Sequence, residues 1–301
     1  MAALGDVDLP VRLLAPRVAT LEELARVHDP EYLLALEEFC AAGGGRPDPD
    51  TIASPGSWDT ALESAGAGLA ATDAVREDGS SIGYVLTRPP GHHALPRRSM
   101  GFCLINNVAV VAATLATAGE RVAVVDWDVH HGNGTQDIFW DDDRVVYVST
   151  HQWPWYPGTG AVDETGGPHA PGTTVNIPLP AGATGDVLLS AMDTVVGPVL
   201  DAFAPTWVLV SAGFDAHRDD PLADLMLTAG DFADLTARSL ALGPRTVFFL
   251  EGGYDIAALR LCVGASLASV AGVPYRPEPA SGGGPGAGAV AAARRAHDLP
   301  D

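Results

Sequence analysis

Val122-Ala-Val-Val-Asp-Trp-Asp-Val-His-His131 gives the clearest indication of the fold. It begins with four apolar residues, three of them valine, and then places Asp126, Asp128 and His130 at every second position. A continuously apolar run is typical of a strand buried on both faces of a parallel sheet. Because side chains alternate along a strand, we expect the three polar residues on one side, at the end where open α/β sheets bind ligands.

Similar apolar runs recur along the chain, and each ends in a polar or glycine-containing turn. The predicted strands are 82–86, 121–126, 144–150, 174–177, 206–211 and 245–250. Helix-like stretches lie between them, at 57–76, 106–118, 185–203, 228–242 and 255–270. This alternation of strands and helices predicts a doubly wound α/β fold rather than an α+β arrangement.

The length and composition fit one large domain. The chain has 301 residues, 47% of them apolar, which is enough for a sizeable core. After about Pro274 the composition shifts to proline, glycine and alanine, a bias that is typical of mobile segments. We therefore expect a single domain at 1–273 and a mobile tail at 274–301, with room for a short terminal helix.

The charge excludes one class of partner. The formal net charge is −21, and all 17 basic residues are arginine. A field of this sign repels phosphates, so we expect no nucleic-acid partner, and it attracts cationic peptides or polyamines. A compositional bias toward alanine, glycine, arginine and aspartate is the simpler explanation, and charge alone identifies no substrate.

Nothing in the sequence indicates export or membrane insertion. The chain has no run of 18 apolar residues, and its first twenty residues place acids and prolines where a signal peptide needs a basic start and an apolar stretch. We expect a soluble, cytoplasmic protein with no membrane partner. Cys40, Cys103 and Cys262 lie too far apart along the chain to suggest a disulfide framework or a CxxC metal site.

Asp128 and His130 have the chemistry of metal ligands, and Asp215, which follows another predicted strand, could add a second carboxylate. Three protein ligands of mixed oxygen and nitrogen type, with a fourth position left to water, fit a catalytic zinc site better than a closed structural one. Fe²⁺ or Co²⁺ would accept the same ligands. The alternative is that Asp126 and Asp128 only cap a helix that starts near Asn133.

Two histidines and a tyrosine follow other strands. His92 and His93 could supply a general base and an electrostatic partner, because histidine exchanges protons near neutral pH. Each ring needs an orienting group on its other nitrogen, for which Asp126 and Asn133 have suitable chemistry. Tyr254 follows two glycines, and its phenol could donate to an oxyanion, although on its own it is more simply interpreted as a buried core tyrosine.

Six motifs occur in order along the chain. They are RPPGHHA (88–94), GFCLINN (101–107), DWDVHHGNGTQ (126–136), VSTHQWPWYPGTG (148–160), SAGFDAH (211–217) and EGGY (251–254). Together they resemble the histone deacetylase and acetylpolyamine amidohydrolase superfamily, in its class II-like bacterial branch, over roughly residues 20–272. The resemblance implies the arginase/deacetylase three-layer α/β fold with a central, mainly parallel, eight-stranded sheet.

The resemblance also implies roles for the matching residues. The zinc ligands would be Asp128, His130 and Asp215, and the catalytic residues His92, His93, Tyr254, Asp126 and Asn133. The acyl-lysine channel would be lined by Gly101, Phe102, Tyr156 and Leu222. A structural potassium ion would be held by Asp126, Asp128, His130, Ser149 and Thr150. Of the two histidines, His93 is favoured as general base and acid, and Asn133, which some members replace by aspartate, should lower its basicity.

The expected function is a zinc-dependent amidohydrolase that removes acetyl or other acyl groups from lysine-type amines with a metal-activated water. The substrate would be an acylated lysine peptide, an acetylpolyamine or a small metabolite. Leu222 stands where polyamine-selective relatives carry a glutamate, which argues against a polyamine. An arginase-like binuclear hydrolase is a weaker alternative, because SAGFDAH offers one aspartate rather than a DxD pair. A non-catalytic acyl-amine binding protein is also weaker, because no catalytic residue is missing.

Overall fold

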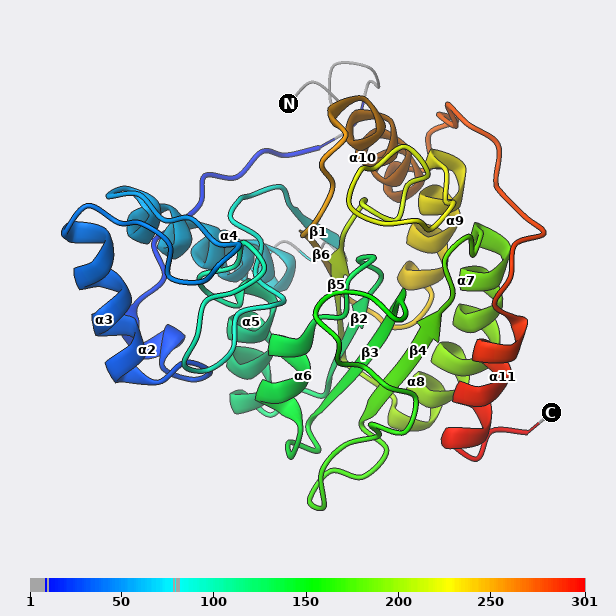
Figure 1. The fold of residues 1–301 in the computed structure, drawn as a ribbon, viewed down its shortest axis with the longest axis horizontal. Helices are drawn as coiled ribbons and strands as arrows, with labels where there is room; N and C mark the ends of the chain where they lie inside the picture. Colours follow the sequence, from blue (N-terminus) through cyan, green and yellow to red (C-terminus); the bar gives the residue numbers. More distant parts are fainter. Residues whose placement is uncertain (1–8, 10, 78, 80–81, 301) are drawn as a thin grey trace.

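A parallel six-stranded sheet forms the centre of the molecule (Figure 1). The structure is a computed structural model and describes residues 9, 11–77, 79 and 82–300. In spatial order the strands are β1 (Ile82–Val85), β6 (Thr246–Leu250), β5 (Trp207–Ala212), β2 (Val122–Asp126), β3 (Val145–Gln152) and β4 (Thr174–Leu179). All neighbouring pairs in this sheet are parallel, so the carboxyl ends of the strands lie at one edge.

The six strands predicted from apolar runs are all confirmed, with ends that differ by no more than two residues. The eight strands implied by the family resemblance are wrong for the described part of the chain, where the sheet has six. The segments that flank the sheet in sequence, 11–56 and 274–286, form helices and loops rather than edge strands. The apolar pattern of the residues was therefore a better guide to the strand number than the analogy.

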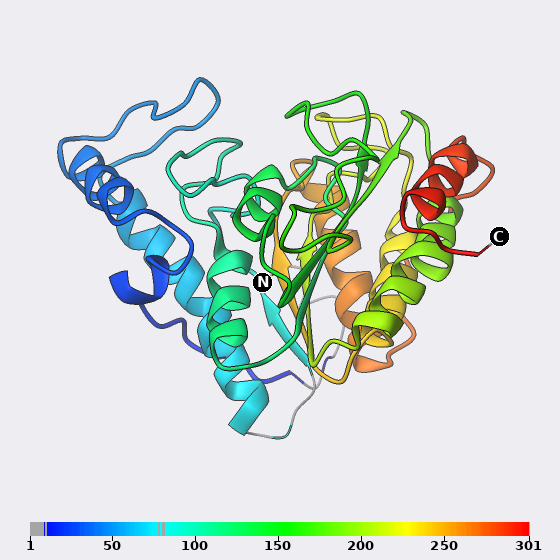
Figure 2. The same ribbon diagram turned by 90° about the horizontal axis from the view of Figure 1, so that it is seen from below.

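Helices cover both faces of the sheet (Figure 2). One layer contains α2 (Leu21–Leu24), α3 (Pro30–Ala41), α4 (Ser57–Glu77), α5 (Asn107–Thr117) and α6 (Asn133–Phe139). The other contains α7 (Gly185–Ala191), the π-helix η1 (Met192–Val196), α8 (Gly197–Phe203), α9 (Ala229–Leu240), α10 (Ile256–Ala271) and α11 (Ala287–Ala296). The predicted doubly wound α/β fold is thus confirmed.

The sheet separates two hydrophobic cores. In β2, Ala123 and Val125 pack into the core beneath α7 to α11, whereas Val122 and Val124 pack into the core beneath α4 and α5. All four side chains are buried. The continuous apolar run of this strand therefore has a simple cause, because each face of the strand meets a helical layer.

The stretch predicted as one helix at 185–203 is helical throughout but divided into α7, η1 and α8. Pro198, the second residue after the π-helical turn, has no backbone N–H to donate to a carbonyl in the preceding turn. A single π-helical turn inside an α-helix changes the hydrogen-bond spacing locally without ending the helix.

Residues 274–301, expected to be a mobile tail, contact the domain at several points. Val290 and Ala293 of α11 are buried in the core beside β4. The Ser281 hydroxyl donates to Asp231 Oδ2 at 2.6 Å, and Glu278 accepts a hydrogen bond from the backbone N–H of Ala229 at 2.8 Å. The segment is attached along the helical layer, and its mobility stays a prediction. The first eight residues of the predicted domain at 1–273 lie outside the described residues.

Within the described ranges, no helix is both long enough and apolar enough to cross a membrane.

Candidate metal centre and active-site cavity

The carboxyl ends of three adjacent strands bring distant parts of the sequence together. β2 ends at Asp126, β5 is followed by the loop that carries Asp215, and β6 is followed by the turn that carries Tyr254. β5 pairs with β2 on one side and with β6 on the other. The polar strand ends predicted to converge therefore lie around one point of the sheet edge.

Asp128, His130 and Asp215 form the candidate metal centre. Their ligand atoms all lie within 4.8 Å of one another. His130 Nδ1 lies 3.1 Å from Asp128 Oδ1 and 3.2 Å from Asp215 Oδ2. Backbone donors fix both carboxylates, since the N–H of Gly252 donates to Asp128 Oδ2 at 2.7 Å and that of Val129 to Asp215 Oδ1 at 3.1 Å.

The donor set fits a divalent cation. Burial and the nearby Asp128 carboxylate raise the pKa of Asp215 to about 6, because two buried carboxylates repel each other. A cation between them would remove this repulsion, and two oxygens with one imidazole nitrogen suit zinc and similar ions. The alternative that Asp126 and Asp128 merely cap α6 is not supported, because Gly132 occupies the N-cap and no side chain caps that helix.

The tandem histidines lie beside the metal centre, with ring centroids 4.0 Å apart. His92 Nδ1 lies 2.9 Å from Asp126 Oδ2, and His93 Nδ1 lies 2.8 Å from Asn133 Oδ1. Both orienting partners proposed from the sequence are thus in hydrogen-bond contact with their histidines. Both rings line the cavity described below, and His92 Nε2 also lies 3.8 Å from Asp128 Oδ1.

The two histidines have opposite acid–base character. Burial lowers the pKa of His92, but the carboxylates of Asp126, Asp128 and Glu251 outweigh this effect and raise the pKa to about 10. Burial also lowers the pKa of His93, here together with the positive charges of His92 and His130, to well below its usual value. At neutral pH His92 is therefore the charged member of the pair and His93 the neutral one, available as a base.

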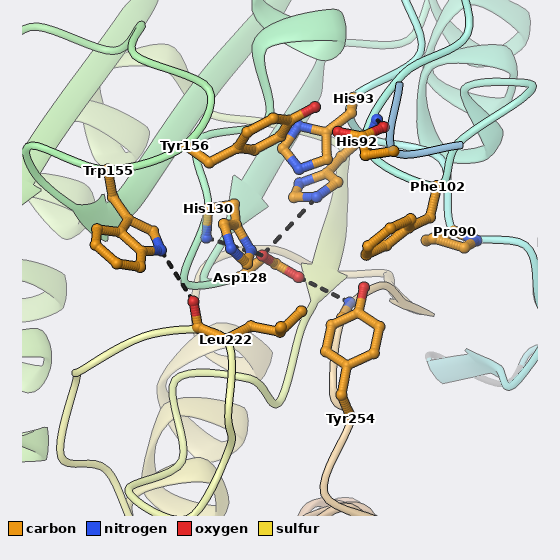
Figure 3. A pocket seen from close by; sticks show the side chains of 13 residues that line it. Pro90, His92, His93, Phe102, Asp128, His130, Trp155, Tyr156, Leu222 and Tyr254 are labelled. Carbon is orange, nitrogen blue, oxygen red and sulfur yellow. Dashed lines mark hydrogen bonds and ion pairs between the residues drawn. The ribbon is translucent and has the colours of Figure 1, made fainter. Parts of the chain in front are cut away.

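A cavity of about 230 Å³ opens above the metal centre. Figure 3 shows Tyr254 on one side of it, with its hydroxyl directed toward the cavity, and Tyr156 on the other. No group in the described part of the chain accepts a hydrogen bond from the Tyr254 hydroxyl. Its ring lies between Phe102, at 5.6 Å, and the Arg88 guanidinium, at 5.4 Å. The phenol is thus placed by its neighbours rather than buried as a core tyrosine.

All four residues expected along the acyl-lysine channel line this cavity, namely Gly101, Phe102, Tyr156 and Leu222. Gly101 has a positive φ of 58°, and a Cβ there would lie 2.2 Å from the His93 ring. Gly101 was expected to line the substrate channel, and the structure adds that its missing side chain leaves room for the His93 ring. Trp155, which the sequence did not single out, joins the rim and donates from Nε1 to the Leu222 carbonyl at 3.0 Å.

Two further residues hold the cavity wall and were missed by sequence reasoning. Asp50 Oδ1 accepts from the N–H of Gly101 at 3.0 Å, and Thr51 Oγ1 accepts from the N–H of Phe102 at 3.1 Å. Phe102 has a φ of 65°, which is costly for a residue with a side chain. These two hydrogen bonds offset the cost. Asp50 and Thr51 lie in an irregular loop with no motif, so no sequence signal indicated them.

Sequence reasoning also gave no role to Glu251. Its Oε2 accepts from the N–H groups of Gly91 and His92, at 2.7 and 3.2 Å, and its Oε1 accepts from Ser211 Oγ at 3.2 Å. The carboxyl is completely buried, and burial raises its pKa to about 7. The EGGY motif pointed to this position, but the sequence did not reveal that its glutamate fixes the turn before the tandem histidines.

The residues expected to hold potassium lie on β2, β3 and the loop after β2. Asp126 and Ser149 are register partners in these two strands, and Thr150 follows directly on β3. Ser149 Oγ already contacts His151 Nδ1 at 2.9 Å. The potassium ion stays a prediction.

The fold and the site define an α/β enzyme with a candidate Asp-His-Asp metal centre at the carboxyl edge of a parallel sheet. The histone deacetylase domain family matches residues 2–270. The chain therefore belongs to the histone deacetylase family, whose members here include deacetylases and an amidohydrolase.

Individual relatives agree with this assignment. A probable deacetylase of Archaeoglobus fulgidus is 43% identical over 250 residues, which are 81% of this chain and 69% of that protein. A histone deacetylase-like amidohydrolase of Pseudomonas aeruginosa is 42% identical over 263 residues, 85% of this chain and 69% of that protein. The crystal structure of the HDA15 HD domain superposes with a TM-score of 0.90 at 35% identity, covering 98% of this chain and 84% of that one.

The length covered differs among the relatives. This chain spans 62% to 69% of the length of the first curated relatives that it matches. The activities of those longer proteins as a whole are therefore not established for this chain by the similarity.

Proposed function

We propose that the chain is a zinc-dependent amidohydrolase that removes acetyl or other acyl groups from lysine-type amines. One observation carries the proposal: Asp128, His130 and Asp215 have metal-binding spacing, and Asp128 and His130 line a cavity that His93 and Tyr254 also line. A base, a hydrogen-bond donor and a candidate cation site thus face one space large enough for an acyl amide.

Asp128, His130 and Asp215 would hold the ion, which when bound supplies Lewis acidity at the amide carbonyl and the water. His93 is neutral and has Nε2 free, so it accepts a proton from the attacking water and passes it to the departing amine. The Tyr254 hydroxyl donates to the oxyanion. His92, held charged by Asp126, adds positive charge beside the reacting carbonyl. Water and amide thereby become a carboxylate and a free amine.

The cavity walls support a lysine-type substrate. Phe102 and Tyr156 offer aromatic surfaces for a methylene stem, and Leu222 adds an apolar wall. An acetylpolyamine or a small acylated metabolite is the alternative substrate, favoured by the net charge of −21 but opposed by the apolar Leu222, which offers no partner to a second ammonium group. Histone or other protein acetyl-lysine is not distinguished from other acyl-lysines by these contacts.

Two other readings have less support. Within the described residues a single group of His, Cys, Asp or Glu side chains has metal-binding spacing, whereas an arginase-like site needs ligands for two ions. A binding protein without turnover would not need a neutral histidine and a phenol around the cation site. The cytoplasmic location and the structural potassium ion stay predictions.

A hydrolysis screen tests the proposal. The purified chain is incubated with acetyl-lysine peptides, longer acyl-lysine peptides and acetylpolyamines, each with chelator, with added zinc and with neither. We expect release of the carboxylate from an acyl-lysine, its loss with chelator and its recovery with zinc. Asp215→Ala serves as the matched variant that lacks one ligand. Turnover that resists chelation, or no turnover of any acylated amine with zinc bound, would contradict the proposal.

A further inference from the structure

Asp220 lies in the loop between β5 and α9, next to the cavity but outside it. Only 6% of the residue is exposed. Its Oδ2 accepts from two successive backbone N–H groups, that of Tyr254 at 2.6 Å and that of Asp255 at 3.1 Å. Its Oδ1 accepts from the N–H of Leu222 at 3.1 Å. The carboxylate therefore joins two loops that are more than thirty residues apart in sequence.

The turn that presents Tyr254 depends on this carboxylate for its hydrogen bonds. Tyr254 follows Gly253, which has a φ of 129°, and precedes Asp255, the N-cap of α10. Asp220 accepts a hydrogen bond from the N–H groups of both Tyr254 and Asp255. Hydrogen bonds from N–H groups to a buried carboxylate are shorter and stronger than neutral ones, so the position of the Tyr254 Cα is set by Asp220.

The same carboxylate connects Tyr254 to the cavity rim. Asp220 holds the N–H of Leu222, and the Leu222 carbonyl accepts from the Trp155 indole at 3.0 Å. Figure 3 shows Trp155, Leu222 and Tyr254 around one side of the cavity. A shift of the loop would thus move the phenol relative to the metal centre and also relative to the wall.

We propose that Asp220 is a positioning residue that holds the Tyr254 hydroxyl at the place where the oxyanion forms. The inference rests on the proposed function, because it assigns Tyr254 the role of oxyanion donor. A phenol displaced by about 1 Å loses much of its contribution, so the turnover number, kcat, falls by roughly 10- to 100-fold without Asp220. The loss falls mainly on kcat rather than KM, and metal content changes little, since the hydrogen bonds of the Asp220 carboxylate go to backbone N–H groups and not to Asp128, His130 or Asp215.

A double-mutant cycle tests this role. Asp220→Ala and the milder Asp220→Asn are each made alone and in combination with Tyr254→Phe, and kcat, KM, zinc content and the thermal midpoint are measured for all. Asp219→Ala is the matched control, because it is the neighbouring carboxylate and its side chain is 64% exposed. Asparagine keeps one oxygen acceptor, so Asp220→Asn should lie between wild type and Asp220→Ala.

If Asp220 acts through Tyr254, Asp220→Ala lowers kcat by at least about tenfold in the wild-type background and by less than about twofold once the phenol hydroxyl is gone. Equal losses in both backgrounds would overturn the inference, as would losses that follow zinc content or the thermal midpoint. A change confined to KM would also overturn it and assign Asp220 to the Leu222 wall. Absence of turnover in the zinc-loaded wild type would instead contradict the proposed function itself.

Discussion

The Nδ1 atom of His93 lies 2.8 Å from Oδ1 of Asn133. An amide oxygen orients the ring and accepts its N–H, but unlike a carboxylate it carries no charge that would stabilise the imidazolium form. The neighbouring His92 meets the Asp126 carboxylate at 2.9 Å. This difference in partner, an amide for one ring and a carboxylate for the other, agrees with the low pKa of His93 and the high pKa of His92.

Asn133→Asp is therefore expected to raise the pKa of His93. The base must be neutral, so activity is lost as the pH falls through that pKa. A higher pKa moves the acid limb of the kcat/KM profile to higher pH, by about one unit or more for a carboxylate at this distance. The pH profiles of the variant and wild type measure the shift. Asn133→Ala is the control, since it removes the orienting group without adding charge and should lower kcat/KM without that upward shift.

Tyr254→Phe is expected to reduce kcat by roughly 10²–10³-fold, the typical cost of one oxyanion donor. Zinc content should not change, because Tyr254 is not among the grouped metal-site side chains. Steady-state kinetics with metal analysis of the same samples checks both statements. Unchanged turnover would remove the oxyanion role from this residue.

The order of thermal stability of Asp215→Asn and wild type should depend on whether metal is bound. The pKa of Asp215 in the folded chain is about 6, above the roughly 3.9 of an unfolded aspartate. A raised carboxyl pKa means that the metal-free fold loses stability as the pH rises from about 4 to about 6. At pH 7 the metal-free variant should therefore melt above metal-free wild type, whereas zinc should stabilise wild type more than the variant. Thermal unfolding with chelator and with zinc measures both differences, and the same order under both conditions would contradict the cation site.

Much of the fold and of the metal centre followed from the sequence for one physical reason. Buried parallel strands are continuously apolar and end abruptly. The run at 122–125 therefore predicted both the strand and the polar residues that follow it. Because parallel strands share a carboxyl edge, Asp215 was expected near Asp128, and the structure brings them together.

What could not be predicted depends on loop conformation. The hydrogen bonds between Asp50 and Gly101 and between Asp220 and Tyr254 join irregular segments. Such segments have no periodic pattern of apolar residues that would predict how they pack together. The strand number also failed where it was taken from analogy, since the edges of a sheet vary while its central strands are fixed by burial on both faces.

His28 is expected to make the stability of the fold depend on pH. Its Nδ1 lies 3.1 Å from the Leu95 carbonyl, and its Nε2 accepts from the N–H of Asn106 at 2.9 Å. Burial lowers the pKa of His28 to about 4. The geometry agrees with this direction, since a proton on Nε2 would face the N–H of Asn106. The unfolded chain takes up this proton near pH 6.5 and the folded chain near pH 4, so stability falls as the pH drops through that window, by at most about 1.4 kcal/mol per pH unit.

Urea unfolding of the chelator-treated protein from pH 7 to pH 4 measures this effect against His28→Gln. Glutamine cannot titrate, so the variant should show the shallower dependence even if its stability at pH 7 is lower. Parallel curves for the two proteins would show that His28 is not held in its neutral form.

Glu278 links the segment at 274–300 to the loop that carries Asp215. Its side chain is 13% exposed, lies 2.9 Å from His217 Nε2 and also pairs with Arg218. His217 is buried and lies two residues after Asp215. Glu278→Ala leaves a buried imidazole and the Ala229 N–H without their acceptor, so it should lower the free energy of unfolding by about 1–3 kcal/mol.

Arg276→Ala is the matched control in the same segment. Arg276 pairs with Asp234 at 2.7 Å, but the two side chains are 43% and 33% exposed, and exposed pairs contribute at most about 1 kcal/mol. Chemical denaturation of both variants, with hydrogen exchange of residues 274–301, separates the two descriptions of the tail. A clear loss for Glu278→Ala alone indicates a segment packed on the domain. Equal, small losses with rapid exchange would instead support the mobility that its composition predicts, because a segment that is detached most of the time stabilises nothing.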